Sequence, residues 1–137
     1  MTLVIDASAV VAALVDSGAD GQWAETLLTS DLAAPHLLPV EVANVLGRAA
    51  NAGEITDDVA SLAHADLLDL RVQFVAYNTV APRIWELRHN LTAYDAWYVA
   101  VAELLDAPLA TMDHRLARSP GPTCTFRTPD DQPEDND

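Results

Sequence analysis

The chain alternates between short apolar runs that are typical of strands and longer segments whose apolar residues recur at helical spacing. The short runs predict strands at residues 3–5, 33–36, 72–77, 108–112 and 123–126. Helical spacing predicts helices at residues 9–15, 23–29, 39–51, 57–70, 81–89 and 92–105, followed by a short helix at 115–118. One stripe of the helix at 57–70 carries Val59, Leu62, Ala63 and Leu67, which we expect to face the core.

Residues with strong local preferences mark several of the predicted helix ends. Ser8 is placed to cap the first helix, and Thr56 is placed to cap the fourth. Pro39 suits the first turn of the third helix, because its missing N–H is not needed there. Asp113 is placed to cap the short last helix. These signals support the boundaries that the apolar spacing predicts.

Strands that alternate with helices of about ten or more residues predict an α/β fold. We expect a single domain at residues 1–127, built as a central, mostly parallel sheet of four to five strands with helices on both faces. In such a sheet, ligands bind at the carboxyl ends of the strands. Residues 128–137 are rich in acids and low in complexity, and we expect them to form a disordered tail.

The amino-acid composition excludes several classes of function. The chain has 137 residues, 50% of them hydrophobic, which is enough for one self-supporting core. Its 21 acidic residues outnumber 7 basic residues, all of them Arg, for a net charge of −14. Without lysine there is no Walker-A loop and no Schiff-base lysine. Such acidity argues against general nucleic-acid binding, so any contact with phosphates must be local.

Other features bear on the cellular location of the chain. Cys124 is the single cysteine, so no intramolecular disulfide can form. The amino terminus lacks the basic region of a signal peptide, and the uninterrupted apolar runs are too short to span a bilayer. We therefore expect a cytoplasmic protein that does not associate with membranes.

Four carboxylates stand in unusually apolar surroundings: Asp6, Glu41, Asp95 and Asp113. Each has a purely structural alternative. Asp6 and Asp113 can cap the turns that follow them, Asp95 can form a capping box with Thr92, and Glu41 can point to solvent. However, the predicted topology brings all four to the same edge of the sheet. We expect them to converge there.

Carboxylates crowded together repel one another unless a divalent cation intervenes, and an all-oxygen site suits Mg²⁺ or Mn²⁺ rather than Zn²⁺. The four histidines show no zinc-ligand spacing. Ser8, Asn44 and Thr111 lie at offsets from which they can orient a carboxylate, a water or a phosphate, or make only local hydrogen bonds. Candidate cations for flanking phosphates, each also able to form a surface ion pair, are Arg48, Arg88, Arg115 and Arg118.

Four segments, at residues 3–9, 39–46, 91–103 and 109–113, together resemble the PIN-domain ribonuclease family, most closely the VapC-like toxins of type II toxin–antitoxin pairs. The resemblance implies a Mg²⁺-dependent endoribonuclease that cleaves RNA with Asp6, Glu41, Asp95 and Asp113. It further implies that Asp6 and Asp95 bind the metal directly, while Glu41 and Asp113 act through water or a second metal. A homodimer and a small antitoxin protein that enters the active-site groove are implied as well.

Two other functions stay open at this point. The first is a Mg²⁺-dependent phosphatase with Asp6 as nucleophile, although the chain lacks the lysine that such enzymes need. The second is a non-catalytic PIN-like module that binds a partner, in which the four acids are structural. Spacing along the chain does not separate these functions from a nuclease.

Overall fold

The computed structural model describes residues 1–129, which contain one five-stranded sheet. All of its neighbouring strands pair in parallel, in the order β3-β2-β1-β4-β5. The strands are β1 (Thr2–Ile5), β2 (Asp31–Pro35), β3 (Val72–Val75), β4 (Leu109–Ala110) and β5 (Phe126–Arg127). The predicted α/β fold with a parallel sheet is therefore confirmed.

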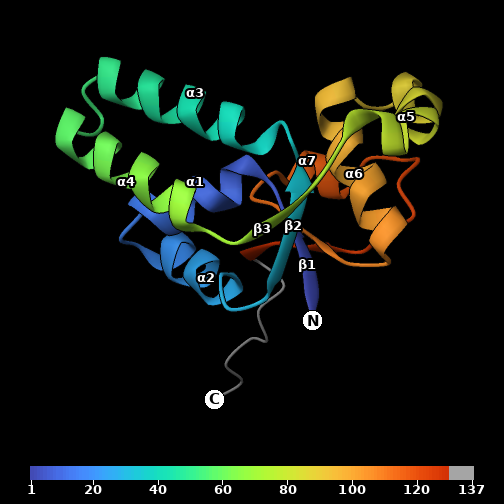
Figure 1. Ribbon diagram of the computed structural model, residues 1–137, viewed down its shortest axis with the longest axis horizontal. Coiled ribbons are helices and arrows are strands. Elements are labelled where there is room, and N and C mark those ends of the chain that lie inside the picture. The colour runs from blue at the N-terminus through green and yellow to red at the C-terminus, as the bar shows by residue number, and fades with distance from the viewer. Residues whose placement is uncertain (130–137) are drawn as a thin grey trace.

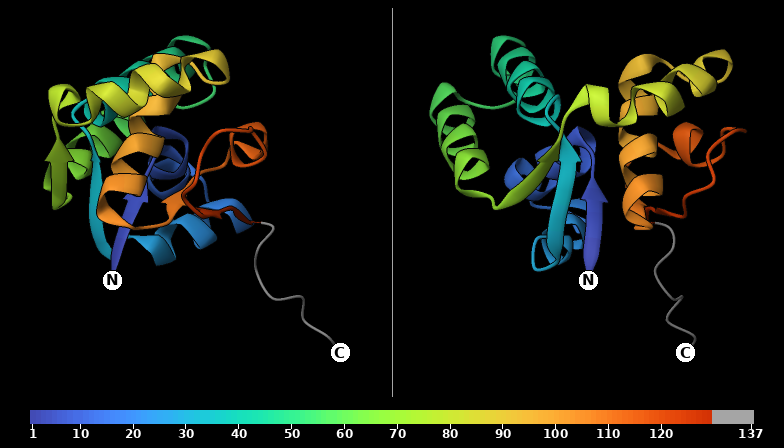
Figure 2. Two further views of the ribbon diagram at one scale, coloured as in Figure 1. Left: turned by 90° about the vertical axis from the view of Figure 1, so that its right-hand side faces the viewer. Right: turned by 45° about the vertical axis from the view of Figure 1, so that its right-hand side comes forward.

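Helices cover the sheet on both sides (Figure 1). They are α1 (Ala7–Val15), α2 (Ala19–Leu27), α3 (Leu38–Asn51), α4 (Asp57–Asp69), α5 (Tyr77–Glu86), α6 (Ala93–Leu105) and α7 (His114–Ala117), with a 3-10 turn, η1, at Leu87–His89. Helices α1 to α4 form one layer, and α5 and α6 lie on the opposite side (Figure 2). Helix α6 packs directly against β1 and β2.

Strand β1 and helix α6 form the centre of the core. Leu3, Val4 and Ile5 are completely buried, as expected for a parallel strand covered on both faces. Val99 and Val101 of α6 are completely buried as well. Because β1 and α6 are so firmly packed, a side chain carried at the end of either element is held on a rigid support.

The strand order places a topological switch point between β1 and β4. From β1 the chain builds outward through β2 to β3, and it then returns to add β4 on the other side of β1. In open parallel sheets this arrangement leaves a crevice at the carboxyl ends of the two central strands. Asp6 directly follows β1, and Asp113 lies three residues after the end of β4. Both therefore lie at the crevice.

Three predicted helix starts are wrong. Helix α2 begins at Ala19 and not at residue 23, because Gly18 is its cap and Gly21, instead of breaking the helix, lies buried inside it. Helix α1 begins at Ala7 and not at Ala9, because Asp6 instead of Ser8 is its cap and accepts a hydrogen bond from the Ala9 N–H. Helix α5 begins at Tyr77 although Pro82 lies inside it. Burial of its Val80 stabilises this earlier start, so tertiary packing outweighs the local effect of proline.

The predicted apolar stripe of α4 is only half correct. Ala63 and Leu67 are buried, but Val59 is 42% exposed and Leu62 is 67% exposed. Helix α4 lies on the outside of its layer, where it packs against α3 and α1. These helices cover only a narrow strip of α4, so the two remaining apolar residues face outward.

The structure describes the carboxyl-terminal end of the predicted domain and only the first two residues of the predicted tail. Thr128 is buried beside β5, whereas residues 130–137 of the predicted tail lie outside the described residues. Within residues 1–129, no helix has the length and apolar character needed to cross a membrane.

Candidate active site

A pocket of about 470 Å³ lies at the carboxyl edge of the sheet and brings the four predicted carboxylates together. Asp6 reaches it from the end of β1, Glu41 from α3, Asp95 from the first turn of α6, and Asp113 from the segment after β4. The other lining residues are Ala7, Ser8, Val11, Asn44, Val45, Arg48, Tyr98 and Met112. Residues separated by more than a hundred positions thus share one cavity.

Asp6 is 8% exposed and held by hydrogen bonds on one oxygen. Its Oδ1 accepts from the Ser8 hydroxyl at 2.6 Å and from the Ala9 N–H at 3.0 Å. Burial raises the pKa of Asp6 to about 6, although the hydrogen bonds from Ser8, Thr111 and Ala9 favour the charged form and offset part of that effect. The nearby charge of Glu41 adds a smaller upward contribution.

Ser8 and Thr111 connect the two central strands at the pocket. The Ser8 hydroxyl donates to Asp6 and accepts from the Met112 N–H at 3.0 Å. Thr111 is completely buried, and its hydroxyl accepts from the Asp113 N–H at 2.9 Å. These bonds fix the segment after β4 relative to the end of β1. Both residues therefore position the acids that the sequence places beside them.

Asp113 caps α7, as predicted, and also lines the pocket. Its Oδ1 accepts both cap hydrogen bonds, from the Arg115 N–H at 2.9 Å and the Leu116 N–H at 3.2 Å. Because both cap bonds go to one oxygen, the cap orients the carboxylate and leaves its second oxygen for another ligand. The structural role and the placement in the pocket are thus compatible.

Glu41 and Tyr98 contribute two buried polar atoms to the pocket. Glu41 Oε1 and the Tyr98 hydroxyl are buried and have no hydrogen bond of good geometry within residues 1–129. The two groups nevertheless lie close enough to influence each other. Burial raises the pKa of Glu41, and the nearby Tyr98 hydroxyl offsets part of that rise. Burial also raises the pKa of Tyr98, and the Glu41 carboxylate adds to it. Buried polar atoms without partners are costly, so these two are suited to a water or a bound ligand.

Asp95 lies in the first turn of α6, where Thr92 caps the helix by accepting a hydrogen bond from the Asp95 N–H at 3.2 Å. Burial raises the pKa of the half-buried Asp95 carboxyl, and the charge of Asp113 raises it further. Asp6 also interacts with Glu41, and Glu41 with Asp95. The four acids therefore form one continuous set of mutually repelling charges.

This set of donors fits a hydrated divalent cation. Over the described range 1–129, no three Asp, Glu, His or Cys side chains are arranged to enclose a metal ion. Mg²⁺, however, keeps several waters and is commonly held by only one or two carboxylates. The buried oxygens of Glu41 and Tyr98 lie near each other without a hydrogen bond of good geometry among the described residues, so they are suited to hydrogen bonds with such waters. The residues present thus match the chemistry of Mg²⁺ or Mn²⁺ with open coordination positions.

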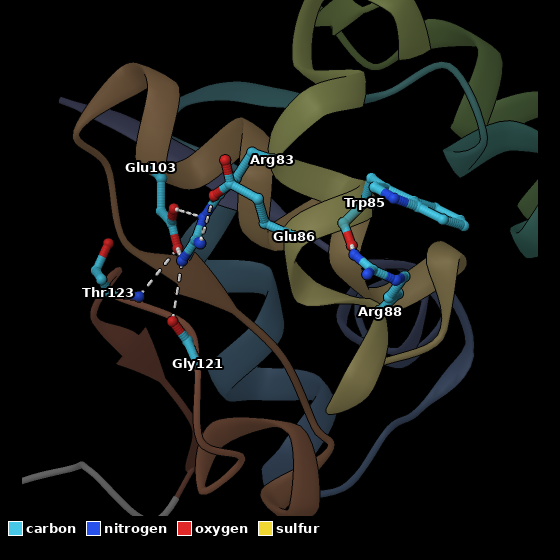
Figure 3. A network of polar contacts seen from close by, with 7 residues as sticks. All are labelled: Arg83, Trp85, Glu86, Arg88, Glu103, Gly121 and Thr123. Carbon is cyan, nitrogen blue, oxygen red and sulfur yellow. Dashed lines mark hydrogen bonds and ion pairs between the residues drawn. The ribbon is translucent and has the colours of Figure 1, made fainter.

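The predicted supporting and cationic residues differ in where they lie. Asn44 and Arg48 line the pocket on the same helix as Glu41. Arg115 lies close enough to Asp95 to lower its pKa. Arg88 is instead stacked on Trp85, 4.4 Å from the ring centroid, on the outer surface of α5 and η1 (Figure 3).

Arg83 belongs to a separate polar network, which links α5, α6 and the loop before β5 (Figure 3). Its Nε donates to Glu103 Oε1 at 2.7 Å, and its guanidinium also binds Glu86 at 3.1 Å and the Gly121 carbonyl at 2.9 Å. The Thr123 N–H donates to the same Glu103 carboxylate at 2.9 Å. None of these residues lines the acidic pocket, so the network holds elements together.

Tyr98 lines the pocket but is not among the site residues that the sequence predicted. It is only 3% exposed, yet its hydroxyl faces the pocket. The available signal was its position three residues after Asp95, which places both side chains on one face of the helix.

Comparison with known proteins agrees with this geometry. Residues 3–121 match the PIN domain family. Ribonuclease VapC1 of Mycobacterium tuberculosis is 42% identical over 132 residues, which cover 90% of this chain and 95% of that protein.

Two solved structures share the architecture. VapBC2 of Rickettsia felis, bound to a DNA fragment from its promoter, superposes with a TM-score of 0.66 at 14% identity, covering 93% of this chain and 98% of that one. VapC20 of Mycobacterium tuberculosis, a toxin that cleaves the sarcin–ricin loop, superposes with a TM-score of 0.63 at 19% identity. The match covers 83% of this chain and 92% of that one. At these identities the two structures support the fold alone.

Proposed function

The chain belongs to the PIN domain family, and from this membership we propose that it is a Mg²⁺-dependent endoribonuclease, the toxin of a type II toxin–antitoxin pair. The observation that carries the proposal is the convergence of Asp6, Glu41, Asp95 and Asp113 on one pocket at the switch point of the sheet. A relative at 42% identity that is a ribonuclease supports the same activity.

Asp6 and Asp95 are the proposed direct metal ligands, with Mn²⁺ as a substitute for Mg²⁺. When bound, the cation supplies Lewis-acid chemistry, which lowers the pKa of water and neutralises charge that develops on phosphate oxygens. The Ser8 hydroxyl, 2.6 Å from Asp6 Oδ1, holds the Asp6 carboxylate in one orientation. The cap bonds of α7 do the same for Asp113.

Glu41 is the proposed residue that orients the attacking water and accepts its proton. Its buried Oε1 has no partner of good geometry among the described residues and lies in the same pocket as Asp6 and Asp95. Burial raises the pKa of this carboxyl, so it holds a proton more readily than an exposed glutamate does. Asp113 completes the site through water or a second cation.

The proposed partners follow from the family and from the structural neighbours. A VapBC complex shares the fold, which supports a small antitoxin protein as the partner that inhibits this chain. RNA is the proposed substrate, and a homodimer is the proposed oligomeric state. The apolar side chains left exposed on α4 provide surface for one of these contacts.

Cleavage of a panel of structured and single-stranded RNAs by the purified chain, free of any antitoxin, tests the proposal. We expect cleavage with Mg²⁺ or Mn²⁺ and none with EDTA. Asp6→Asn and Asp95→Asn should each lower the rate by more than about 100-fold, because even outer-shell partners of a metal contribute about 10- to 100-fold. The exposed Asp66→Asn on α4 makes the same chemical change away from the pocket and should cleave like the parent.

The outcomes separate this activity from the two alternatives. Full cleavage by both pocket variants would contradict the assigned site. Phosphate release from small phosphomonoesters without RNA cleavage would favour a phosphatase. Failure to bind Mg²⁺ or Mn²⁺ at millimolar concentration, together with absent cleavage, would favour a non-catalytic binding module.

A further inference from the structure

Arg48 is the only basic residue that lines the acidic pocket in the described part of the chain. It lies on α3, seven residues after Glu41, and Asn44 and Val45 lie between them. These four positions follow helical spacing and share one face, and all four line the pocket. Helix α3 therefore presents, in order, a carboxylate, an amide and a guanidinium along one wall of the cavity.

The guanidinium of Arg48 is not used by the fold. The side chain is exposed, and no ion pair or side-chain hydrogen bond joins it to another residue within 1–129. Four carboxylates line the same pocket, yet none pairs with it. By contrast, Arg83 is held by Glu86 and Glu103, and Arg88 is stacked on Trp85.

The acidity of the chain makes a basic residue at the pocket important if RNA is the substrate. The chain carries a net charge of −14, so its general field repels a polyanion. Attraction must come from cations close to the reaction site. An arginine is suited to this, because its planar guanidinium binds two phosphate oxygens at once.

We propose that Arg48 binds an RNA phosphate next to the scissile one and so sets how the strand lies across the pocket. This assignment rests on the proposed function. Seven residues of helix separate the backbones of Glu41 and Arg48 by about 10 Å, so Arg48 stands about two helical turns from the carboxylate of Glu41 along the pocket wall. Arg48 therefore contacts a flanking phosphate and acts as a positioning residue, while the acids act at the cleaved bond.

RNA affinity measures this contact without relying on cleavage. The Asp6→Asn chain is titrated, with Mg²⁺ present, into a fluorescently labelled single-stranded oligoribonucleotide, alone and combined with Arg48→Ala, Arg48→Lys or Arg71→Ala. Arg71 is an exposed arginine at the opposite, amino-terminal edge of the sheet, so its substitution changes the net charge equally. We expect Arg48→Ala to weaken binding about tenfold. The RNA affinity of Arg48→Lys should lie between those of the Arg48 and Arg48→Ala chains, because lysine keeps the charge and loses the paired donors.

Salt dependence and kinetics separate a phosphate contact from a structural effect. Loss of one phosphate contact should reduce the slope of log affinity against log salt by about 0.7. In the chain with Asp6 intact, Arg48→Ala should raise KM more than it lowers kcat, since a flanking phosphate is held equally before and during reaction. Arg71→Ala should change neither quantity.

The results distinguish the failure of Arg48 from the failure of the proposed activity. RNA cleavage by the intact chain, together with affinity and salt slope that do not depend on Arg48, would overturn only the role of Arg48. Equal losses for Arg48→Ala and Arg71→Ala would likewise overturn it, by showing a general charge effect. Arg48-dependent binding without any cleavage would support the contact and contradict the nuclease. If neither the unaltered chain nor Asp6→Asn bound the RNA, both the role of Arg48 and the proposed activity would be overturned.

Discussion

At the scale of single residues, Asp6 combines two requirements that conflict. As the cap of α1 it accepts hydrogen bonds that favour the charged carboxylate. As a residue that is 8% exposed it loses hydration, which favours the neutral acid. Burial is the larger effect, because the pKa rises to about 6. A buried charge is thus retained at a cost to stability, which is typical of functional sites.

This cost predicts that Asp6→Asn stabilises the metal-free protein at neutral pH. The folded carboxyl binds its proton more tightly than the unfolded one, so its contribution to stability falls as the pH rises from about 4 to about 6 and stays low above that. Asparagine keeps a capping oxygen and removes the charge. We expect the variant to gain about 1–3 kcal/mol in free energy of unfolding at neutral pH. The gain should shrink near about pH 4.

Urea unfolding followed by circular dichroism in EDTA, across this pH range, measures the gain. Asp66→Asn serves as the control, because its exposed side chain lies on α4 away from the pocket. A variant at Asp6 that is no more stable than the parent at neutral pH would contradict the effect of burial.

At the scale of elements, the site depends on how closely α2 folds back against α1, which carries Ala7, Ser8 and Val11 of the pocket. Gly21 of α2 makes this approach possible. A Cβ atom at Gly21 would lie 1.8 Å from the Asp16 carbonyl oxygen and 3.0 Å from the Ala12 carbonyl oxygen. Both neighbours are backbone atoms, so they cannot move aside without shifting a helix.

We therefore expect Gly21→Ala to destabilise the fold by about 1–3 kcal/mol or more, as overpacking does. Gly47→Ala is the matched comparison, because a Cβ at Gly47 in α3 would meet nothing within 4 Å. There the better helix propensity of alanine should stabilise by about 0.5–1 kcal/mol. Thermal unfolding of both variants measures the two effects: the Tm should fall for Gly21→Ala and rise for Gly47→Ala. Equal effects of the two substitutions would contradict the close approach of α1 and α2.

At the scale of the whole molecule, negative charge lowers stability in two ways, through the net charge of the chain and through repulsion within the pocket. The net charge of −14 opposes compaction in general, but the four carboxylates of the pocket repel one another at close range. A divalent cation bound there would relieve the local repulsion, whereas a monovalent salt would screen only the general field. Metal binding is thus expected to appear in the stability of the entire chain.

Millimolar Mg²⁺ should raise the Tm of the parent more than NaCl of equal ionic strength does. A ligand at 100 times its Kd stabilises a fold by about 2.7 kcal/mol, and each kcal/mol raises the Tm of a chain of this size by roughly 3–5 °C. Asp6→Asn should lose most of the specific Mg²⁺ effect and keep the effect of NaCl. Equal shifts by the two salts in the parent would contradict a metal site in the pocket.

The sequence by itself determined the alternation of strands and helices and the four carboxylates at the ends of these elements. Both are local properties: apolar periodicity shows which residues can be buried together, and an acid without charged neighbours is visible in the chain. The parallel sheet is favoured by the same pattern, because strands that alternate with helices typically pair in parallel. These features identify Asp6, Glu41, Asp95 and Asp113 without coordinates.

Only the tertiary structure decided which other side chains share the pocket. Tyr98 faces it because α6 packs on β1 and β2, and Arg48 lines it because α3 packs against α1, which begins at the end of β1. For the same reason Asp6 rather than Ser8 caps α1, and Leu62 of α4 is exposed instead of buried. Spacing along the chain puts Tyr98 on the face of Asp95 and Arg48 on the face of Glu41, but it does not show that these two faces meet. Strand order and helix packing bring them together.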